Sequence, residues 1–283
     1  MVKDYYDRRK LYDSLKILIM FVVLVIFVIY AIFPILWMAL TSIETTKEIY
    51  SFPPVFPPKF LTLENYESVL GMNVPLYLFN STFVTTTSTI IDVLLGSLAG
   101  YALGRFEFKL KKMFSLMFII LLALPYAIYI LPLFIMELDL NIVNTYWALI
   151  LPYTAVNLPW SVLIMQSSFE SIPREIEDAS RIDGCSYGKA FWNIMFPLAR
   201  QGVIVAAIFT FVNIWSDLLF VEAFITSDAL RTFPSGLLVI RAQSTFAYTA
   251  LAPSVIISIL PTLVMFLILQ NYFIKGATEG GVK

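Results

Sequence analysis

Long apolar stretches separated by short polar segments dominate this sequence. The hydrocarbon core of a bilayer is ~30 Å thick, so a spanning helix needs about 20 mostly apolar residues. The clearest stretch, residues 17–40, runs for 24 residues without a charged side chain. A signal-peptide core has only about 7–15 apolar residues, so we expect a retained first helix here. Five further spanning helices are expected at residues 80–103, 113–133, 146–166, 201–221 and 251–273.

The positions of the lysine and arginine residues predict the orientation. Membrane proteins keep an excess of these residues in their cytosolic segments. With the N-terminus inside, the cytosolic segments carry 15 of the 19 basic residues and the external loops carry 4. We therefore predict an all-α membrane protein with six transmembrane helices and both termini in the cytosol. Its expected parts are a cytosolic segment at 1–16, the first helix with an external loop at 17–75, a core of five helices at 76–274 that includes a cytosolic loop at 167–200, and a cytosolic tail at 275–283.

Prolines indicate where the backbone should be irregular. The external loop carries four prolines between residues 53 and 58, which favour stiff, extended backbone. A short external helix is expected to follow, with Thr62 as its cap. In the third span, Pro125 and Pro132 are expected to break or kink the helix, because proline lacks the N–H donor.

The composition agrees with a membrane location and excludes several functions. Hydrophobic residues make up 59% of the chain and charged residues 14%, whereas soluble domains carry about 25% charged residues. The net charge of −1 gives no basis for nucleic-acid binding. The chain has no histidine, which is the commonest general base and metal ligand, and a single cysteine, Cys185. Neither a metal site nor an internal disulfide is expected.

Two intramembrane acids leave one enzymatic alternative. Asp92 and Asp217 could form a carboxylate pair of the kind that intramembrane aspartyl proteases use. Their neighbours Ile91 and Ser216 do not match the Tyr-Asp and Gly-x-Gly-Asp contexts of those enzymes. We therefore expect a protein that is not an enzyme.

The cytosolic loop at 167–200 is the most informative segment. Pro173 suits the first turn of a helix, and three acidic residues follow it where the helix dipole favours negative charge. Gly184 is expected to end or bend this helix. A second short helix is expected from Ser186 to just before Pro197. The residues alone therefore predict a helix–bend–helix, with an ordinary amphipathic loop on the membrane as the alternative.

The same loop resembles the EAA signature of binding-protein-dependent ABC importers. That signature reads Glu-Ala-Ala, three residues, Gly, nine residues, Ile-x-Leu-Pro. This chain keeps the spacing, with Asp178-Ala179-Ser180, Gly184 and Ile194-Met195-Phe196-Pro197. The chain departs from the signature at three positions, with Asp178 in place of Glu, Ser180 in place of Ala and Phe196 in place of Leu. In that family the loop is a coupling helix that docks in a cleft of the ATPase subunit. The resemblance therefore implies an ATPase-coupling role for Glu177, Asp178, Ala179, Ser180, Asp183, Gly184, Ile194 and Pro197.

Three other segments resemble one branch of that family, the carbohydrate permeases related to the maltose system. They are Leu61–Tyr66, Phe211–Asp217 and Lys275–Lys283. Ser216 and Asp217 depart from the branch's Trp-Asn-Glu motif. The resemblance implies the type I ABC importer permease fold. It also implies that Gly280 and Gly281 of the tail reach toward the ATPase interface.

The resemblance further implies an assembly in the cytoplasmic membrane of a prokaryote. The expected partners are a second, similar permease that forms a heterodimer with this chain, two ATPase subunits and an external solute-binding protein. This chain has no phosphate loop of the Gly-x-x-x-x-Gly-Lys-Ser/Thr kind. ATP and Mg are therefore expected on the ATPase, with no cofactor on this chain. A non-transporting scaffold is the remaining alternative, and the coupling-type loop argues against it.

Polar residues within the expected spans indicate either a solute pathway or contacts between helices. A central Asp costs ~2.5–3.5 kcal/mol on insertion scales, so Asp92 should face the bundle interior or water. On the same helix, glycines recur at every fourth residue from 96 to 104, as expected of a close-packing face. The candidate translocation residues are Asp92, Tyr126, Asn213, Trp215 and Asp217, and each has a structural role as its alternative.

The expected spans also bear on the substrate. Sites of this kind recognise sugars through a few hydrogen-bonding groups and aromatic faces. An anionic substrate would require intramembrane Lys or Arg, and the six spans contain none. We therefore expect a permease subunit that carries a neutral mono- or oligosaccharide. A polyol, glycerol phosphate or another non-sugar solute is the alternative.

Overall fold

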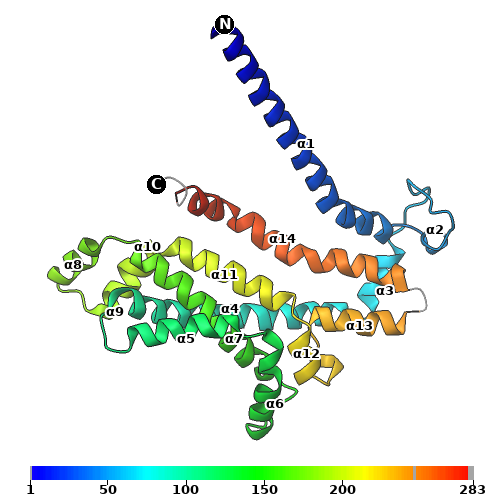
Figure 1. Cartoon of the computed structure of the whole chain (residues 1–283). Coiled ribbons are helices and arrows are strands. Elements are labelled where there is room, and N and C mark those ends of the chain that lie inside the picture. The colour runs from blue at the N-terminus through cyan, green and yellow to red at the C-terminus, as the bar shows by residue number, and fades with distance from the viewer. Residues whose placement is uncertain (1, 245–246, 280–283) are drawn as a thin grey trace. The chain divides into compact units, whose positions relative to one another are not determined.

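The computed structural model describes residues 2–244 and 247–279, and helices form most of it (Figure 1). Within these residues the only β pairing is a single bridge between Glu44 and Leu61. The all-α fold is confirmed. The elements are α1 Val2–Ser42, α2 Thr46–Ile49, α3 Glu64–Gly71, α4 Val74–Arg105, α5 Lys111–Ala123, η1 Tyr126–Tyr129, α6 Ile130–Asp139, α7 Trp147–Glu170, α8 Arg174–Ile182, α9 Tyr187–Ala190, η2 Phe191–Met195, α10 Phe196–Leu198, α11 Arg200–Trp215, α12 Leu219–Phe224, η3 Asp228–Leu230, α13 Phe233–Gln243 and α14 Ala247–Glu279.

The described residues contain between four and six candidate membrane spans. Four helices are long and apolar enough by themselves, namely Ser14–Ser42 of α1, all of α4, all of α7, and Tyr248–Ile268 of α14. Two more spans arise if each of two bent helix pairs counts as one, namely Lys111–Ala123 with Tyr126–Asp139, and Tyr187–Leu198 with Arg200–Trp215. The upper number agrees with the six spans that the sequence predicts.

The third span is broken. α5 ends at Ala123, η1 begins at Tyr126, and the two halves of the span lie at 105° to each other. Pro125 lies at the break, where it supplies no N–H and restricts the residue before it. Pro132 lies in the first turn of α6, where proline is tolerated, and the helix continues past it. The predicted break is therefore confirmed at Pro125 and not at Pro132.

Two boundaries expected near the fifth span are wrong. α11 ends at Trp215 and not at Val221, because Asp217 Oδ1 accepts a hydrogen bond from Phe220 N at 3.0 Å and a separate helix, α12, begins there. In the loop at 167–200, helical backbone continues through Pro197 to Leu198. The proline occupies the start of α10, where its missing N–H costs little.

The chain divides into two compact units, and each is described by itself. The first comprises Met1–Gly71 and Ile240–Ile257, and the second comprises Met72–Val239 and Ser258–Lys283. In the first unit, Asn65 holds the end of α1: its Nδ2 donates to the carbonyls of Ser42 at 3.1 Å and Glu44 at 2.8 Å. Thr62 Oγ1 accepts from Glu64 N at 3.1 Å, as expected of a cap for α3.

The core of the second unit is the close contact between α4 and α7. A Cβ added at Gly96 would lie 2.6 Å from Ser161 Cβ, and one added at Gly100 would lie 2.7 Å from both Met165 Cβ and Gln166 N. These separations are too short for any side chain, so only glycine permits the approach. The spacing of the glycines predicted this packing face, and the structure identifies its partner as α7.

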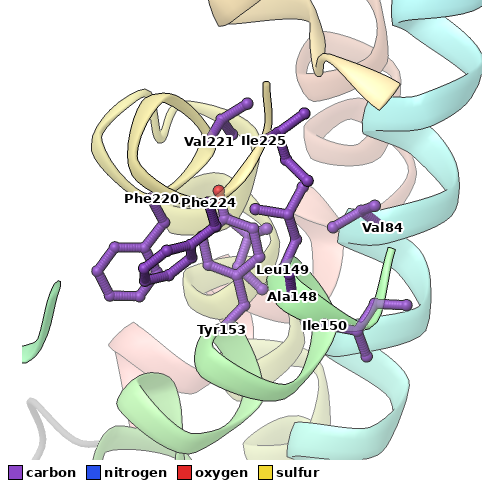
Figure 2. Close-up of a cluster of buried hydrophobic side chains, with 10 residues drawn as sticks. Val84, Ala148, Leu149, Ile150, Tyr153, Phe220, Val221, Phe224 and Ile225 are labelled. Carbon is purple, nitrogen blue, oxygen red and sulfur yellow. The ribbon is translucent and has the colours of Figure 1, made fainter. Parts of the chain in front are cut away.

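A second core lies where α7 begins, and Figure 2 shows its side chains turned toward one another. Phe220 of α12 stacks on Tyr126 at 4.5 Å and on Tyr153 at 5.7 Å between ring centroids. α12 and the break in the third span are thereby fixed against α7. The buried members are Val84, Ala148, Leu149, Ile150, Tyr153, Ile214, Phe220, Val221, Phe224 and Ile225.

Gly100→Ala is expected to destabilise the protein, because the added methyl group overlaps the backbone of α7. Overpacking of this kind costs about 1–3 kcal/mol. Gly71→Ala is the matched control, since no atom lies within 4 Å of a Cβ added there. Thermal unfolding of the two purified variants in detergent checks the prediction. Equal melting temperatures would contradict the proposed contact.

Candidate functional site

The cytosolic loop has the helix–bend–helix form that its residues predict. α8 follows Pro173, and Gly184 after it has φ = +86°, a left-handed conformation that glycine adopts without strain. Ser186 then caps α9 by accepting a hydrogen bond from Lys189 N at 3.3 Å. The bend is therefore encoded by Gly184 and the restart by Ser186.

Two adjacent acids of α8 have different environments. Glu177 is buried: its Oε1 accepts a hydrogen bond from Tyr101 OH at 2.5 Å, and its Oε2 lies 3.3 Å from Arg105 Nε. The side chains of Arg105 and Glu177 are 3% and 11% exposed. Asp178, the next residue, points about 100° away around the helix and is exposed. Of these two acids, Asp178 is the one available to a partner, whereas Glu177 is held within this chain.

Aromatic packing holds the second half of the loop. Tyr101 of α4 lies 5.1 Å from Phe191 and 5.3 Å from Phe169 between ring centroids. Phe191 and Met195 are buried in the same cluster. The loop is therefore fixed to α4 and α7 on one side, and its other side is free for a partner.

The remaining coupling candidates likewise divide into exposed and buried residues. Ala179, Asp183, Gly184 and Pro197 are exposed, and Ile194 is half-buried. Ser180 is buried and donates to the carbonyl of Glu177 at 2.7 Å. Ile182, which the sequence analysis did not single out, is 86% exposed, a large apolar side chain at the end of α8. Gly280 and Gly281 lie outside the described residues.

An open groove of about 340 Å³ lies between α7 and α11. Its polar centre is a hydrogen bond from Asn213 Nδ2 to Asn157 Oδ1 at 2.6 Å. Trp160 and Phe209 form an aromatic wall, with nearly parallel rings 6.4 Å apart. The full lining is Asn157, Trp160, Phe209, Thr210, Val212, Asn213 and Ser216. Amide groups beside aromatic faces can bind a polyhydroxylated solute.

Of the residues that line this groove, Asn213 is the one among the candidate translocation residues predicted from the sequence. Asn157 and Trp160 lie three residues apart on α7, and Phe209 and Asn213 lie four apart on α11, so each pair shares a helix face. That spacing was readable in the sequence. The meeting of the two faces was not, because it depends on how α7 and α11 pack.

The structure places Asp92 in the interior, as expected for an intramembrane acid. Its Oδ2 accepts hydrogen bonds from Thr210 Oγ1 at 2.7 Å and from Ser161 Oγ. Asp92 thus joins α4, α7 and α11. This geometry favours the structural alternative, although Thr210 connects it to the groove. A contact of Asp92 with solute stays a prediction.

The other pathway candidates have well-defined structural partners. Trp215 is buried and donates from Nε1 to the carbonyl of Ser258 at 3.1 Å. Asp217 accepts from Tyr153 OH at 2.8 Å and begins α12. Tyr126 stacks on Phe220. The structure does not bring these three residues into the groove with Asn213, and their contacts with solute stay predictions.

Comparison with known proteins agrees with both the loop and the fold. Residues 92–275 match the family described as the binding-protein-dependent transport system inner membrane component. The chain belongs to this family. It is therefore an inner membrane component of a binding-protein-dependent transport system and not an enzyme. The resemblance of its loop to the family's signature is confirmed at the level of the family.

Several curated relatives cover most of the chain. The sulfoquinovosyl glycerol transport system permease protein SmoH of Agrobacterium fabrum is 35% identical over 251 residues, which are 88% of each chain. The arabinooligosaccharides transport system permease protein AraQ of Halalkalibacterium halodurans is 33% identical and is aligned over 88% of this chain and 90% of its own. The trehalose transport system permease protein SugB of Mycobacterium tuberculosis is 31% identical and is aligned over 88% of this chain and 92% of its own.

Solved structures share the fold. The crystal structure of a bacterial ABC transporter involved in the import of the acidic polysaccharide alginate contains a chain that matches with a TM-score of 0.81 and 18% identity, over 92% of this chain and 97% of that one. A chain of the MetNI methionine ABC transporter in an inward-facing conformation matches with a TM-score of 0.52 and 18% identity, over 69% and 93%. The predicted type I importer permease fold is confirmed.

Asp92→Asn is expected to leave membrane insertion and ATPase co-purification intact, because asparagine keeps an acceptor oxygen for Ser161 and Thr210. Asp92→Leu leaves both buried hydroxyls without this acceptor, which costs about 1–3 kcal/mol. Its melting temperature should therefore fall below that of Asp92→Asn. Asp139→Asn, at an exposed acid, is the control. An Asp92→Leu protein as stable as the parent would exclude the tie between the three helices.

Proposed function

We propose that this chain is one of two permease subunits of an ABC importer that carries a neutral carbohydrate across the cytoplasmic membrane of a prokaryote. The partner permease is a similar chain that forms a heterodimer with this one. Two ATPase subunits dock on the cytosolic side and hold the ATP and Mg, and an external binding protein delivers the solute. ATPase closure then switches the bundle between states open to either side, as in gating around a midplane site.

Relatives support the carbohydrate part of this proposal. SmoH, AraQ and SugB are named for the transport of sulfoquinovosyl glycerol, arabinooligosaccharides and trehalose, and all three align over most of their length. A neutral solute is favoured because the expected spans carry no Lys or Arg. The relatives differ in solute, so the size of the sugar is left open.

The groove between α7 and α11 carries the substrate proposal. Asn157 is buried, and its Nδ2 donates to the carbonyl of Tyr153 while its Oδ1 accepts from Asn213 Nδ2. Asn213 is exposed, and its remaining amide capacity can serve sugar hydroxyls. Trp160 offers a ring that is 54% exposed beside them, and an aromatic face packs well on a pyranose. We assign the groove to the wall of the solute pathway.

The exposed side of the cytosolic loop carries the ATPase proposal. Asp178, Ala179, Asp183 and Gly184 are the signature positions on this side, and they lie beside Ile182, whose side chain is exposed. The centre of a protein interface is more apolar than its rim, so Ile182 is expected to be buried when the ATPase docks. Ser180, Ile194 and Pro197 support the backbone of this surface, and residues 275–283 are proposed to lie near it.

The proposal also divides the chain by topology. Residues 1–16 and the tail 275–283 are cytosolic, and residues 17–75 form the first helix and an external loop. Residues 76–274 form the permease core, with the coupling loop at 167–200. The distribution of basic residues supports this division.

Gly184→Arg is expected to abolish ATPase docking while membrane insertion survives. A residue with φ = +86° cannot take an L side chain without strain, and the arginine would project from the docking surface. Ile182→Asp should have the same effect without backbone strain. The measurement is a mild-detergent pull-down of this chain with identification of the co-purifying proteins. Gly188→Arg, at a glycine with open space around it, is the control.

Recovery of a protein with a phosphate loop and of a second permease with the parent chain supports the proposal. Retention of that ATPase by both Gly184→Arg and Ile182→Asp would show that the docking surface lies elsewhere.

Asn213→Ala is expected to reduce sugar uptake about tenfold, the size expected when a hydrogen bond worth about 1.4 kcal/mol is lost. The matched control is Val212→Ala, because Val212 lines the same groove with an apolar side chain. Uptake of a panel of labelled neutral mono- and oligosaccharides into proteoliposomes that hold the whole transporter is the measurement. If Asn213→Ala transports every sugar at the parent rate, the groove is not the pathway.

A further inference from the structure

A buried polar link joins the cytosolic loop to α4. We propose that Tyr101 and Arg105 are positioning residues that transmit movement of the docking loop to α4, so that an ATPase acting on α8 moves α4, α7 and α11 as one body. This inference rests on the proposed function, because it takes the loop as the ATPase-docking element. It goes beyond that function by naming the residues through which the movement passes.

The geometry of Arg105 is that of a clamp across the loop. Its Nη2 donates to the carbonyl of Ile172 at 2.7 Å, just before α8, and its Nε lies 3.3 Å from Glu177 Oε2, near the middle of α8. The second contact is an ion pair and not an aligned hydrogen bond. Two attachment points fix the direction of α8 relative to α4, whereas one would allow rotation. Lysine has the same charge but a single ammonium group in place of the planar guanidinium, so it cannot contact Ile172 and Glu177 together.

Tyr101 adds a connection to both halves of the loop. Its hydroxyl bonds Glu177 of α8, and its ring packs on Phe191, which follows α9. The bend at Gly184 lies between these two halves. A loop hinged at glycine would flex under load if only one half were held. Because Tyr101 contacts both halves, a movement of α8 is transmitted to α4 and is not absorbed by flexing at Gly184.

The remainder of the path to the groove is already rigid. Gly100 and Gly104, which directly precede Tyr101 and Arg105 in sequence, pack on the backbone of α7. About two helical turns before Gly100 on α4, Asp92 binds Ser161 of α7 and Thr210 of α11. Thr210 lines the groove. A continuous series of buried contacts therefore connects the loop with the proposed solute pathway.

The test uses the whole purified transporter, with the chain's single cysteine removed by Cys185→Ser and a reporter thiol introduced by Ser216→Cys in the groove. The rate at which an aqueous maleimide labels this thiol is compared with and without ATP and Mg. The variants Arg105→Lys, Glu177→Gln and Tyr101→Phe are added in turn. ATPase retention is measured on the same samples.

The expected result is that all three variants keep the ATPase while the ATP-dependent change in labelling rate falls about tenfold, within the 5–150-fold range of typical coupling energies. Tyr101→Phe keeps the aromatic packing and loses one hydrogen bond. The ATP-dependent change in labelling rate should therefore fall least in this variant. Glu175→Gln changes an exposed acid of the same helix and should keep the full change. This control separates the buried link from a general loss of negative charge on α8.

Three outcomes would overturn the inference. A full ATP-dependent change in all three variants would show that the link transmits nothing. Loss of the ATPase from Glu177→Gln, with the parent complex intact, would make Glu177 part of the docking contact instead. A parent transporter that binds no ATPase, or whose labelling does not respond to ATP, would overturn the proposed function and this inference with it.

Discussion

The approach of α4 to α7 is the contact on which the other features of the second unit depend. Helices in lipid gain little from burying apolar side chains against each other, because the lipid tails are equally apolar. Close backbone packing and polar contacts must therefore hold them. Gly96 and Gly100 remove the side chains that would keep α4 and α7 apart. The short distance then lets Asp92 reach Ser161 across the same interface.

Polar residues of the bundle fall into two layers that adjoin along α7 and α11. Asp92, Ser161 and Thr210 form a buried layer in which hydroxyl groups satisfy one carboxylate oxygen. About one turn away, Asn157 and Asn213 form the second layer, which opens into the groove. Because residues three and four apart lie on one helix face, the same two helices supply both layers. One layer holds the bundle, and the other is free to bind a solute.

Adjacent residues on a helix point about 100° apart, and the cytosolic loop uses this to separate two tasks. Glu177 faces α4 and is bound by Tyr101 and Arg105, whereas Asp178 faces water. A buried ion pair adds little net stability, yet breaking one is costly because the remaining charge has no partner. Such a pair is better suited to fixing orientation than to adding stability. The loop is therefore a rigid element with one free side.

The sequence by itself determined the class of the protein, the positions of its long apolar helices, the helix–bend–helix form of the loop at 167–200 and its family. These features depend on local quantities: apolar length, the distribution of basic residues, and the spacing from Asp178 through Gly184 to Pro197. Only the tertiary structure decided which polar residues meet. Arg105 and Glu177 lie 72 positions apart in the numbering, and Asn157 and Asn213 lie 56 apart. No periodicity relates residues on different helices. Their pairing depends on how each helix is rotated about its axis and on how closely the helices approach. For α4 and α7, the glycine contacts determine both the rotation and the distance.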